Sequence, residues 1–141
     1  MTADERKFLI FYIDGRRYAF DLGYVAEVTD PVKSWPIPLA PAYYCGAINF
    51  HGAIVAVMDL ASFLGFDHAP AFEKIIILDV NVAALGFLVE RVARIVSGLD
   101  VDLLEAPNSR FASAELVLPE GNAILLDVDA IVREAENTIN D

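Results

Sequence analysis

Short apolar runs separated by turn residues dominate this chain, and they predict a protein built mainly from β-strands. The first run covers residues 7–13 and is followed by Asp14 and Gly15, a pair typical of two-residue hairpin turns. Residues 18–22 are the expected returning strand, and 24–29 should form a third short strand or a helical turn. The chain is therefore expected to begin with a hairpin.

The middle of the first half alternates between loop and strand signals. Four prolines in residues 31–41 exclude a regular helix or a central strand, so we expect a surface loop there. Two further apolar strands follow at 46–50 and 53–58, joined by a polar bend that contains His51. Asp59 then precedes an apolar i, i+3, i+4 pattern, which predicts the N-cap of a short helix.

The second half of the chain repeats this pattern at an offset of 67 residues, the distance from Phe8 to Ile75. With one more residue of shift, Asp59 corresponds to Asp127, after which a short C-terminal helix is expected. We therefore predict a mainly β fold of two tandem five-stranded SH3-like β-barrels in pseudo-repeat, with short capping helices. The expected halves are residues 1–69 and 70–141, and strands can exchange between them. A chance alignment of apolar strands is the alternative explanation.

The charge balance narrows the choice of partners. A formal net charge of −11, from 21 acidic and 10 basic residues, disfavours nucleic acid and anionic membrane surfaces. No apolar run reaches the roughly 20 residues that a membrane helix needs, so we expect no direct membrane insertion. The first residues lack the apolar region of a signal peptide, and a single cysteine fits a reducing compartment, so the expected location is cytoplasmic.

Few residues suggest catalysis or metal binding. Cys45, His51 and Asp59 could be combined into a thiol triad, but Cys45 follows two tyrosines at the start of a strand, where cysteine acts as a small apolar residue. His51 and His68 with scattered carboxylates are a very weak metal signal. Trp35 is expected to be a loop residue that covers a barrel end. We expect no enzyme activity, no cofactor and no metal.

Several segments, in this order and spacing, carry a family resemblance. They are F-L-I-F-Y-I-D-G-R-R-Y-A-F, Y-V-A-E-V, P-L-A-P-A-Y-Y-C-G-A-I-N-F-H-G-A-I-V-A-V-M-D-L, L-G-F-L-V-E-R-V-A-R-I-V and A-I-L-L-D-V-D-A-I-V. Together they cover nearly the whole chain, which resembles the CheW-like adaptors of bacterial chemotaxis. The resemblance implies a non-enzymatic adaptor between the cytoplasmic tips of methyl-accepting chemoreceptors and the regulatory domain of a CheA-type histidine kinase.

The resemblance also implies contact positions in both halves. In the first half, the positions that face receptors match Val25, Glu27 and Val28, with Gly46 and Gly52 shaping the wall beside them. In the second half, the strand that faces receptors or kinase matches Ile75, Gly86, Val92 and Ile95.

The sequence departs from the family at His51, where the family normally has an arginine that faces Glu27. A histidine is only partly protonated near neutral pH, so it is a weaker partner for a carboxylate than arginine is. Ala56 also replaces a usual proline, and Ala61 a usual arginine. These changes are equally consistent with an adaptor of a divergent sensory or pilus-motility kinase system. Two further hypotheses are a double barrel that binds a small ligand between its halves, and a degenerate enzyme.

Overall fold

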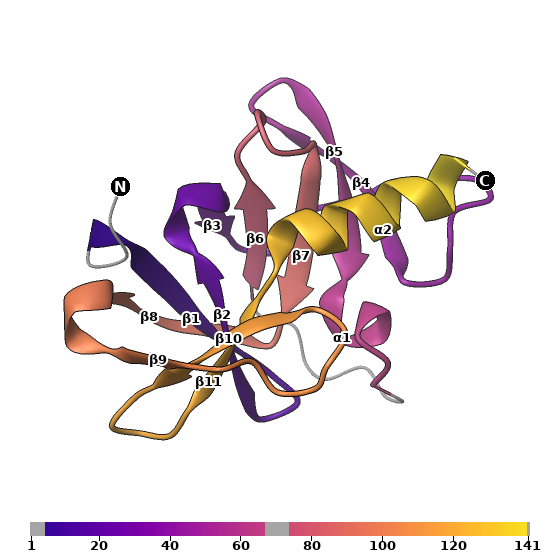
Figure 1. Ribbon diagram of the computed structural model, residues 1–141. Coiled ribbons are helices and arrows are strands. Elements are labelled where there is room, and N and C mark those ends of the chain that lie inside the picture. Colours follow the sequence, from indigo (N-terminus) through magenta and orange to yellow (C-terminus); the bar gives the residue numbers. More distant parts are fainter. Residues whose placement is uncertain (1–4, 67–73, 141) are drawn as a thin grey trace.

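The computed structural model describes residues 5–66 and 74–140, and it is mainly β, as the apolar pattern predicts. Sheet A contains, in spatial order, β8 (Arg91–Ser97), β1 (Lys7–Ile13), β2 (Arg16–Asp21), β11 (Ala123–Leu126), β10 (Ala112–Val117) and β9 (Asp102–Leu104). Sheet B contains β3 (Val25–Thr29), β6 (Lys74–Leu78), β7 (Leu85–Val89), β5 (Ala53–Asp59) and β4 (Tyr44–Phe50). The helices α1 (Leu60–Phe63) and α2 (Val128–Asn140) follow the last strand of each half (Figure 1).

Local sequence signals set the turns and helix starts. Asp14 and Gly15 have φ angles of 51° and 73°. Positive φ at both residues of a two-residue turn matches the right-handed twist of the strands that the turn connects. The carboxylate of Asp59 accepts a hydrogen bond from the backbone N–H of Ser62 at 3.2 Å. The carboxylate of Asp127 does the same for Ala130 at 3.0 Å. The hairpin and both N-caps are therefore confirmed.

The two sheets have matching strand orders once the repeat is applied. At the offset of the repeat, β1 and β2 correspond to β6 and β7, and β3 corresponds to β8. Sheet A joins β1–β2 to β8, β11 and β10, whereas sheet B joins β6–β7 to β3, β5 and β4. Each half of the sequence thus supplies strands to both sheets. The sheets do not coincide with residues 1–69 and 70–141.

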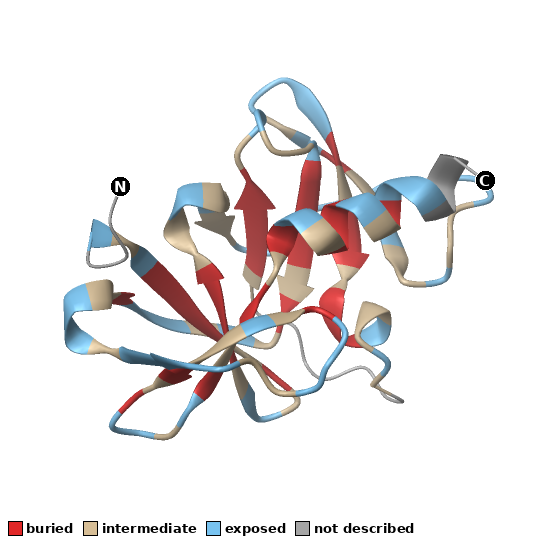
Figure 2. Cartoon of the chain, viewed as in Figure 1, coloured by how far each residue is buried: buried red, intermediate tan, exposed pale blue. Residues whose placement is uncertain are grey.

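Apolar side chains on both faces of the central strands form three clusters. Phe8 and Ile10 of β1 point into a cluster inside sheet A, whereas the intervening Leu9 points into a cluster shared with sheet B. In β6, Ile75 likewise points into a cluster inside sheet B, whereas Ile76 points into the shared cluster. The alternation of period two explains why these strands are continuous apolar runs. Figure 2 shows β6 and β7 coloured as buried over most of their length.

Two details differ from the sequence-based expectation. Sheet A has six strands instead of five, because the short edge strand β9 adds to β10 through the pairing of Leu103 with Leu116. The C-terminal helix α2 has 13 residues and is longer than expected, because its buried residues Ile131 and Ala135 extend the shared cluster. Helix α2 crosses sheet B in Figure 1 and covers its inner face.

Candidate functional site

Glu27 and His51 meet at one end of sheet B, where Nε2 of His51 lies 3.6 Å from Oε1 of Glu27. Glu27 belongs to β3, and His51 follows β4, yet β3 and β4 are the opposite edges of the five-stranded sheet. The sheet must therefore curl around its own cluster of Ile48, Val55, Val57, Ile75 and Ile77. The contact links two segments that the hydrogen-bonded strand order places furthest apart.

The turn between β4 and β5 holds His51 in a fixed position. Phe50 pairs with Ala53, so His51 and Gly52 are the two turn residues, with φ angles of 51° and 85°. The His51 ring packs on Phe50 at a centroid distance of 4.2 Å. The Glu27 and His51 side chains are 46% and 74% exposed, so water screens this pair and its contribution to stability is small. Its position at the surface makes it more suitable for orienting a partner than for holding the fold.

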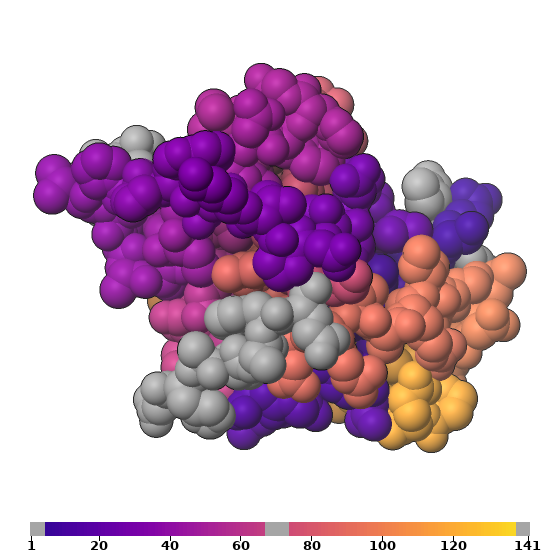
Figure 3. All heavy atoms as spheres, turned by 180° about the vertical axis from the view of Figure 1, so that it is seen from behind, coloured from indigo at the N-terminus to yellow at the C-terminus, as the bar shows by residue number. Residues whose placement is uncertain are grey.

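Three valines lie at the edge of the shared cluster. Val25 and Val28 of β3 and Val92 of β8 are each partly buried and pack against that cluster. On β8, Ile95 is 53% exposed. Figure 3 shows the segment that contains β3 in violet and the segment that contains β8 in orange on the same face of the molecule. Among the apolar contact positions expected on β3 and β8, Ile95 is therefore the most exposed.

Three of the other expected positions lie inside the protein. Ile75 is 2% exposed, and Gly86 is buried with its Cα facing the side chain of Ile75. Gly46 is buried beneath the proline-containing loop, where an added Cβ would lie 2.6 Å from the carbonyl oxygen of Trp35. Gly52 is exposed and shapes only the turn. Any role of Ile75, Gly86 and Gly46 in binding must therefore act through packing of the strands.

The proline-containing loop is attached to sheet B in a way that the sequence did not indicate. Trp35 exchanges two backbone hydrogen bonds with Ala47 of β4, at 2.8 Å and 2.7 Å, and its side chain is 51% exposed. Val32 and Leu39 of the same loop are also exposed. An apolar surface on a loop with four prolines could have been noticed from composition alone.

The geometry does not support a thiol nucleophile. Cys45 is exposed as a residue, yet partial burial of its thiol raises the pKa to about 11, and the nearby Asp59 carboxylate adds to this shift. The thiol is therefore protonated at neutral pH. The Asp59 carboxylate caps α1, and His51 faces Glu27, so the three residues do not form a relay.

Metal-binding and membrane-spanning features are not found in residues 5–66 and 74–140. Within these ranges, no group of three His, Cys, Asp or Glu side chains is arranged to hold a metal ion. His68, the second histidine of the weak metal signal, lies outside the described residues. No helix in the same ranges combines the length and apolar character that a membrane span requires.

Comparison with known proteins extends over almost the whole chain. The profile of a family described as "CheW-like domain" matches residues 7–136. A protein named "Chemotaxis protein CheW" from Thermotoga maritima is 32% identical, over 92% of this chain and 89% of its own length. A "Probable chemotaxis protein CheW" from Rhizobium etli is 27% identical, over 97% of this chain and 94% of its own length.

A solved structure has the same fold. The crystal structure of the scaffolding protein TtCheW from Thermoanaerobacter tengcongensis superposes with a TM-score of 0.77 and 22% identity. The match covers 86% of this chain and 88% of that one. At this identity the likeness concerns the arrangement of the strands and helices.

Proposed function

Because this chain belongs to the CheW-like domain family, we propose that it is a non-enzymatic adaptor that couples chemoreceptors to a CheA-type histidine kinase. The observation that carries the proposal is the family match over residues 7–136, together with relatives named as chemotaxis proteins. The partners are the cytoplasmic tip of a methyl-accepting chemoreceptor and the regulatory domain of the kinase. Such a protein works in the cytoplasm.

The surface around β3 and β8 is the proposed docking site. Val25, Val28 and Ile95 supply partly or fully exposed apolar area, which is the main source of affinity in protein interfaces. Glu27 and His51 lie beside it and orient the partner, because polar and charged groups at the rim of an interface select the partner more than they add affinity. Gly46, Ile75 and Gly86 support the strands from within.

A binding titration against the kinase regulatory domain, and separately against a receptor-tip fragment, tests this proposal. His51→Arg restores a permanent positive charge opposite Glu27, and we expect it to bind at least as tightly as the wild type. His51→Asn is the matched control, because asparagine also accepts the positive φ of this turn but cannot carry a positive charge opposite Glu27. If neither the wild type nor His51→Arg binds any such kinase domain, the adaptor function is wrong.

A second variant tests the apolar surface on β8. Ile95→Lys places a charge at a residue that is 53% exposed, so we expect lost binding with an intact fold. Val92 is a less suitable position, because its side chain packs against the shared cluster and a lysine there would also weaken the fold. Val80→Lys is the control, since Val80 is 77% exposed in the turn between β6 and β7. Normal binding by a folded Ile95→Lys protein would remove β8 from the proposed site.

The three replacements, His51, Ala56 and Ala61, are equally consistent with a second version of the same function. In this version the chain serves a divergent sensory or pilus-motility kinase system. The titration distinguishes the two versions if regulatory domains of several kinases from one host are compared. Preference for a kinase outside the chemotaxis system would support the divergent adaptor.

A further inference from the structure

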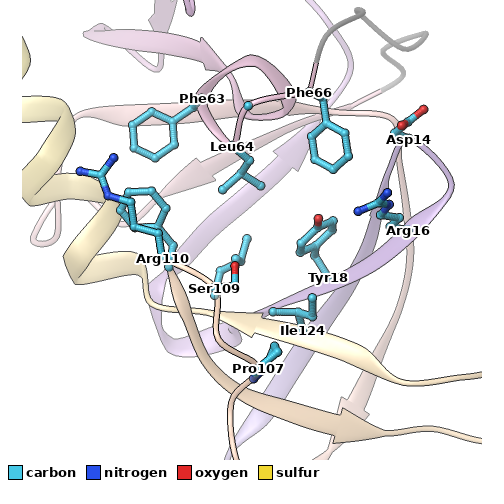
Figure 4. A pocket seen from close by; sticks show the side chains of 13 residues that line it. Asp14, Arg16, Tyr18, Phe63, Leu64, Phe66, Pro107, Ser109, Arg110 and Ile124 are labelled. Atoms are coloured by element: carbon cyan, nitrogen blue, oxygen red, sulfur yellow. The ribbon is translucent and has the colours of Figure 1, made fainter.

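A cavity of about 770 Å³ lies on the side of the molecule formed by β2, β11, α1 and the segment 107–111. In sheet A, β2 and β11 lie on the other side of β1 from β8, so the cavity is separate from the proposed docking surface. Its volume is in the range of small-molecule sites. The side chains that line it come from both halves of the chain, as Figure 4 shows.

Two arginines line this cavity, although the protein has only 10 basic residues against 21 acidic ones. Arg110 and Arg16 lie on opposite sides of it in Figure 4. Arg110 is engaged by Glu134, with Nη2 and Oε1 2.8 Å apart, so its charge is largely balanced. Arg16 is exposed and stacks its guanidinium over the ring of Phe66 at 5.2 Å. Arg16 is therefore the cation best placed to receive an anion.

Aromatic rings form the wall next to these arginines. Phe63 and Phe111 pack at a centroid distance of 5.0 Å with an interplanar angle of 35°, and Phe66 lies further along the same wall. Phe111 is only 7% exposed, so the core holds this part of the wall in place. Rings that are already positioned lose little side-chain entropy when a flat ligand binds. The wall therefore suits a planar aromatic group.

The remaining lining restricts the charge of the ligand. Asp14 lies beside Arg16 in Figure 4, so the lining around Arg16 has little net positive charge and is better matched to an anion with a single charge. A planar carboxylate carries one charge and matches the geometry of a guanidinium. Tyr18 and Ser109 add hydroxyl groups to the lining, and each could donate a hydrogen bond to a carboxylate oxygen.

We propose that this cavity binds an aromatic monocarboxylate, with the ring against Phe63 and Phe66 and the carboxylate on Arg16. The site is independent of the adaptor function, because it shares no residue with the surface around β3 and β8. A ligand there would contact both halves of the sequence, since Phe63 and Phe66 precede residue 69 and Ile124 follows it.

Titration of the full chain with 1-naphthylacetate, followed by backbone amide NMR shifts, tests the proposal. We expect saturable shifts at residues of the cavity, and binding at least about tenfold weaker for the neutral 1-naphthylacetamide, because it lacks the charge-assisted bond to Arg16. Arg16→Gln should remove the difference between the two compounds. Arg133→Gln, on the exposed side of α2, is the matched control and should bind as the wild type does.

A second variant keeps the test decisive if Arg16→Gln alters the hairpin. Ser109→Asp adds a negative charge at an exposed lining position, and we expect it to weaken binding of the carboxylate but not of the amide. The proposal is wrong if naphthylacetate does not bind. It is also wrong if the amide binds equally well, or if the shifts lie outside the cavity. Each of these results leaves the kinase and receptor titrations unaffected.

Discussion

Gly46 and Gly52 both have positive φ angles, but only at Gly46 would a side chain collide with the rest of the protein. A Cβ there would lie 2.6 Å from the carbonyl oxygen of Trp35, whereas nothing lies within 4 Å at Gly52. We expect Gly52→Ala to lower the free energy of unfolding by about 1 kcal/mol through backbone strain alone. Gly46→Ala should cost about 1–3 kcal/mol more, because the loop must move. Urea denaturation of both variants measures the difference, and equal losses would show that the loop yields freely.

Cys45 provides a second test at the scale of one residue. With a pKa of about 11, its thiol is almost entirely protonated at pH 8, and only the thiolate reacts with iodoacetamide. We expect the folded protein to be alkylated at least about a hundredfold more slowly than the same chain in urea, where the pKa returns toward 8.5. The rate should rise as the pH approaches 11. Rapid alkylation of the folded chain at pH 8 would mean that the thiol is not desolvated.

Some features of the candidate site could be predicted from the sequence, and others could not. The opposition of Glu27 and His51 was expected only from the family resemblance, because spacing along the chain does not show that β3 and β4 meet. The burial of Ile75 and the close packing at Gly86 could not be predicted from the sequence, since an apolar residue in a strand can face either side of the sheet. Arg16 and Arg110 are 94 residues apart in the sequence, so only the fold brings them to one cavity.

At the scale of elements, the Asp127 cap controls the start of α2. Its carboxylate accepts the N–H of Ala130, and the same residue donates its own N–H to the carbonyl of Phe111 at 2.7 Å. We expect Asp127→Ala to lower the free energy of unfolding by about 1 kcal/mol, because the cap is lost while the backbone bond remains. Asp127→Asn is the control and should retain most of the stability, since asparagine also caps helices. Equal destabilisation by both variants would show that the charge, and not the hydrogen bond, is what matters.

An ion pair joins β8 to the turn between β10 and β11. Arg94 donates two hydrogen bonds to Glu120, at 3.0 Å and 2.9 Å, and these bonds lower the pKa of Glu120 below its ordinary value of 4.5. A lowered pKa means that the pair stabilises the fold above pH 4.5, and that this stabilisation is lost as the pH falls through the folded-state pKa.

Thermal unfolding across pH tests this link with the variant Glu120→Gln. We expect a small difference in melting temperature from the wild type at pH 7, because both side chains are at the surface. The difference should disappear in acid below pH 4.5. Glu115→Gln, at another glutamate of the same hairpin, is the control for removing one negative charge. A difference that stays constant down to the lowest pH would contradict the role of the ion pair.

The positions of strands and helices could be predicted from the local sequence more reliably than the pairing of the strands. The Asp14-Gly15 turn and the caps at Asp59 and Asp127 depend on neighbours within four residues, so the sequence contains the whole signal. The short edge strand β9 depends on pairing with β10, and its three residues have no apolar alternation of their own. The repeat likewise shows which segments are alike, but not which copy each segment pairs with.

At the scale of the whole molecule, the exchanged strands make the two halves of the sequence depend on each other. Residues 1–69 contain β1 and β2 of sheet A but β3, β4 and β5 of sheet B, and residues 70–141 contain the complementary strands. The parallel pairs β2–β11 and β5–β7 each join one half to the other. The shared cluster also takes residues from both halves, including Phe20 and Phe87, whose rings pack at 5.4 Å.

The fragments 1–69 and 70–141 should therefore not fold when each is produced alone. Either fragment would expose its part of the shared cluster and leave strands of both sheets without their partners from the other half, so its buried apolar surface is too small to offset the loss of chain entropy. We expect no cooperative thermal transition for either fragment by circular dichroism, and recovery of the native spectrum when the two are mixed in equal amounts. The full chain should unfold in one transition, because neither sheet can be lost without the other. A fragment that unfolds cooperatively by itself would show that one half is an autonomous domain, and that strand exchange is not what holds the halves together.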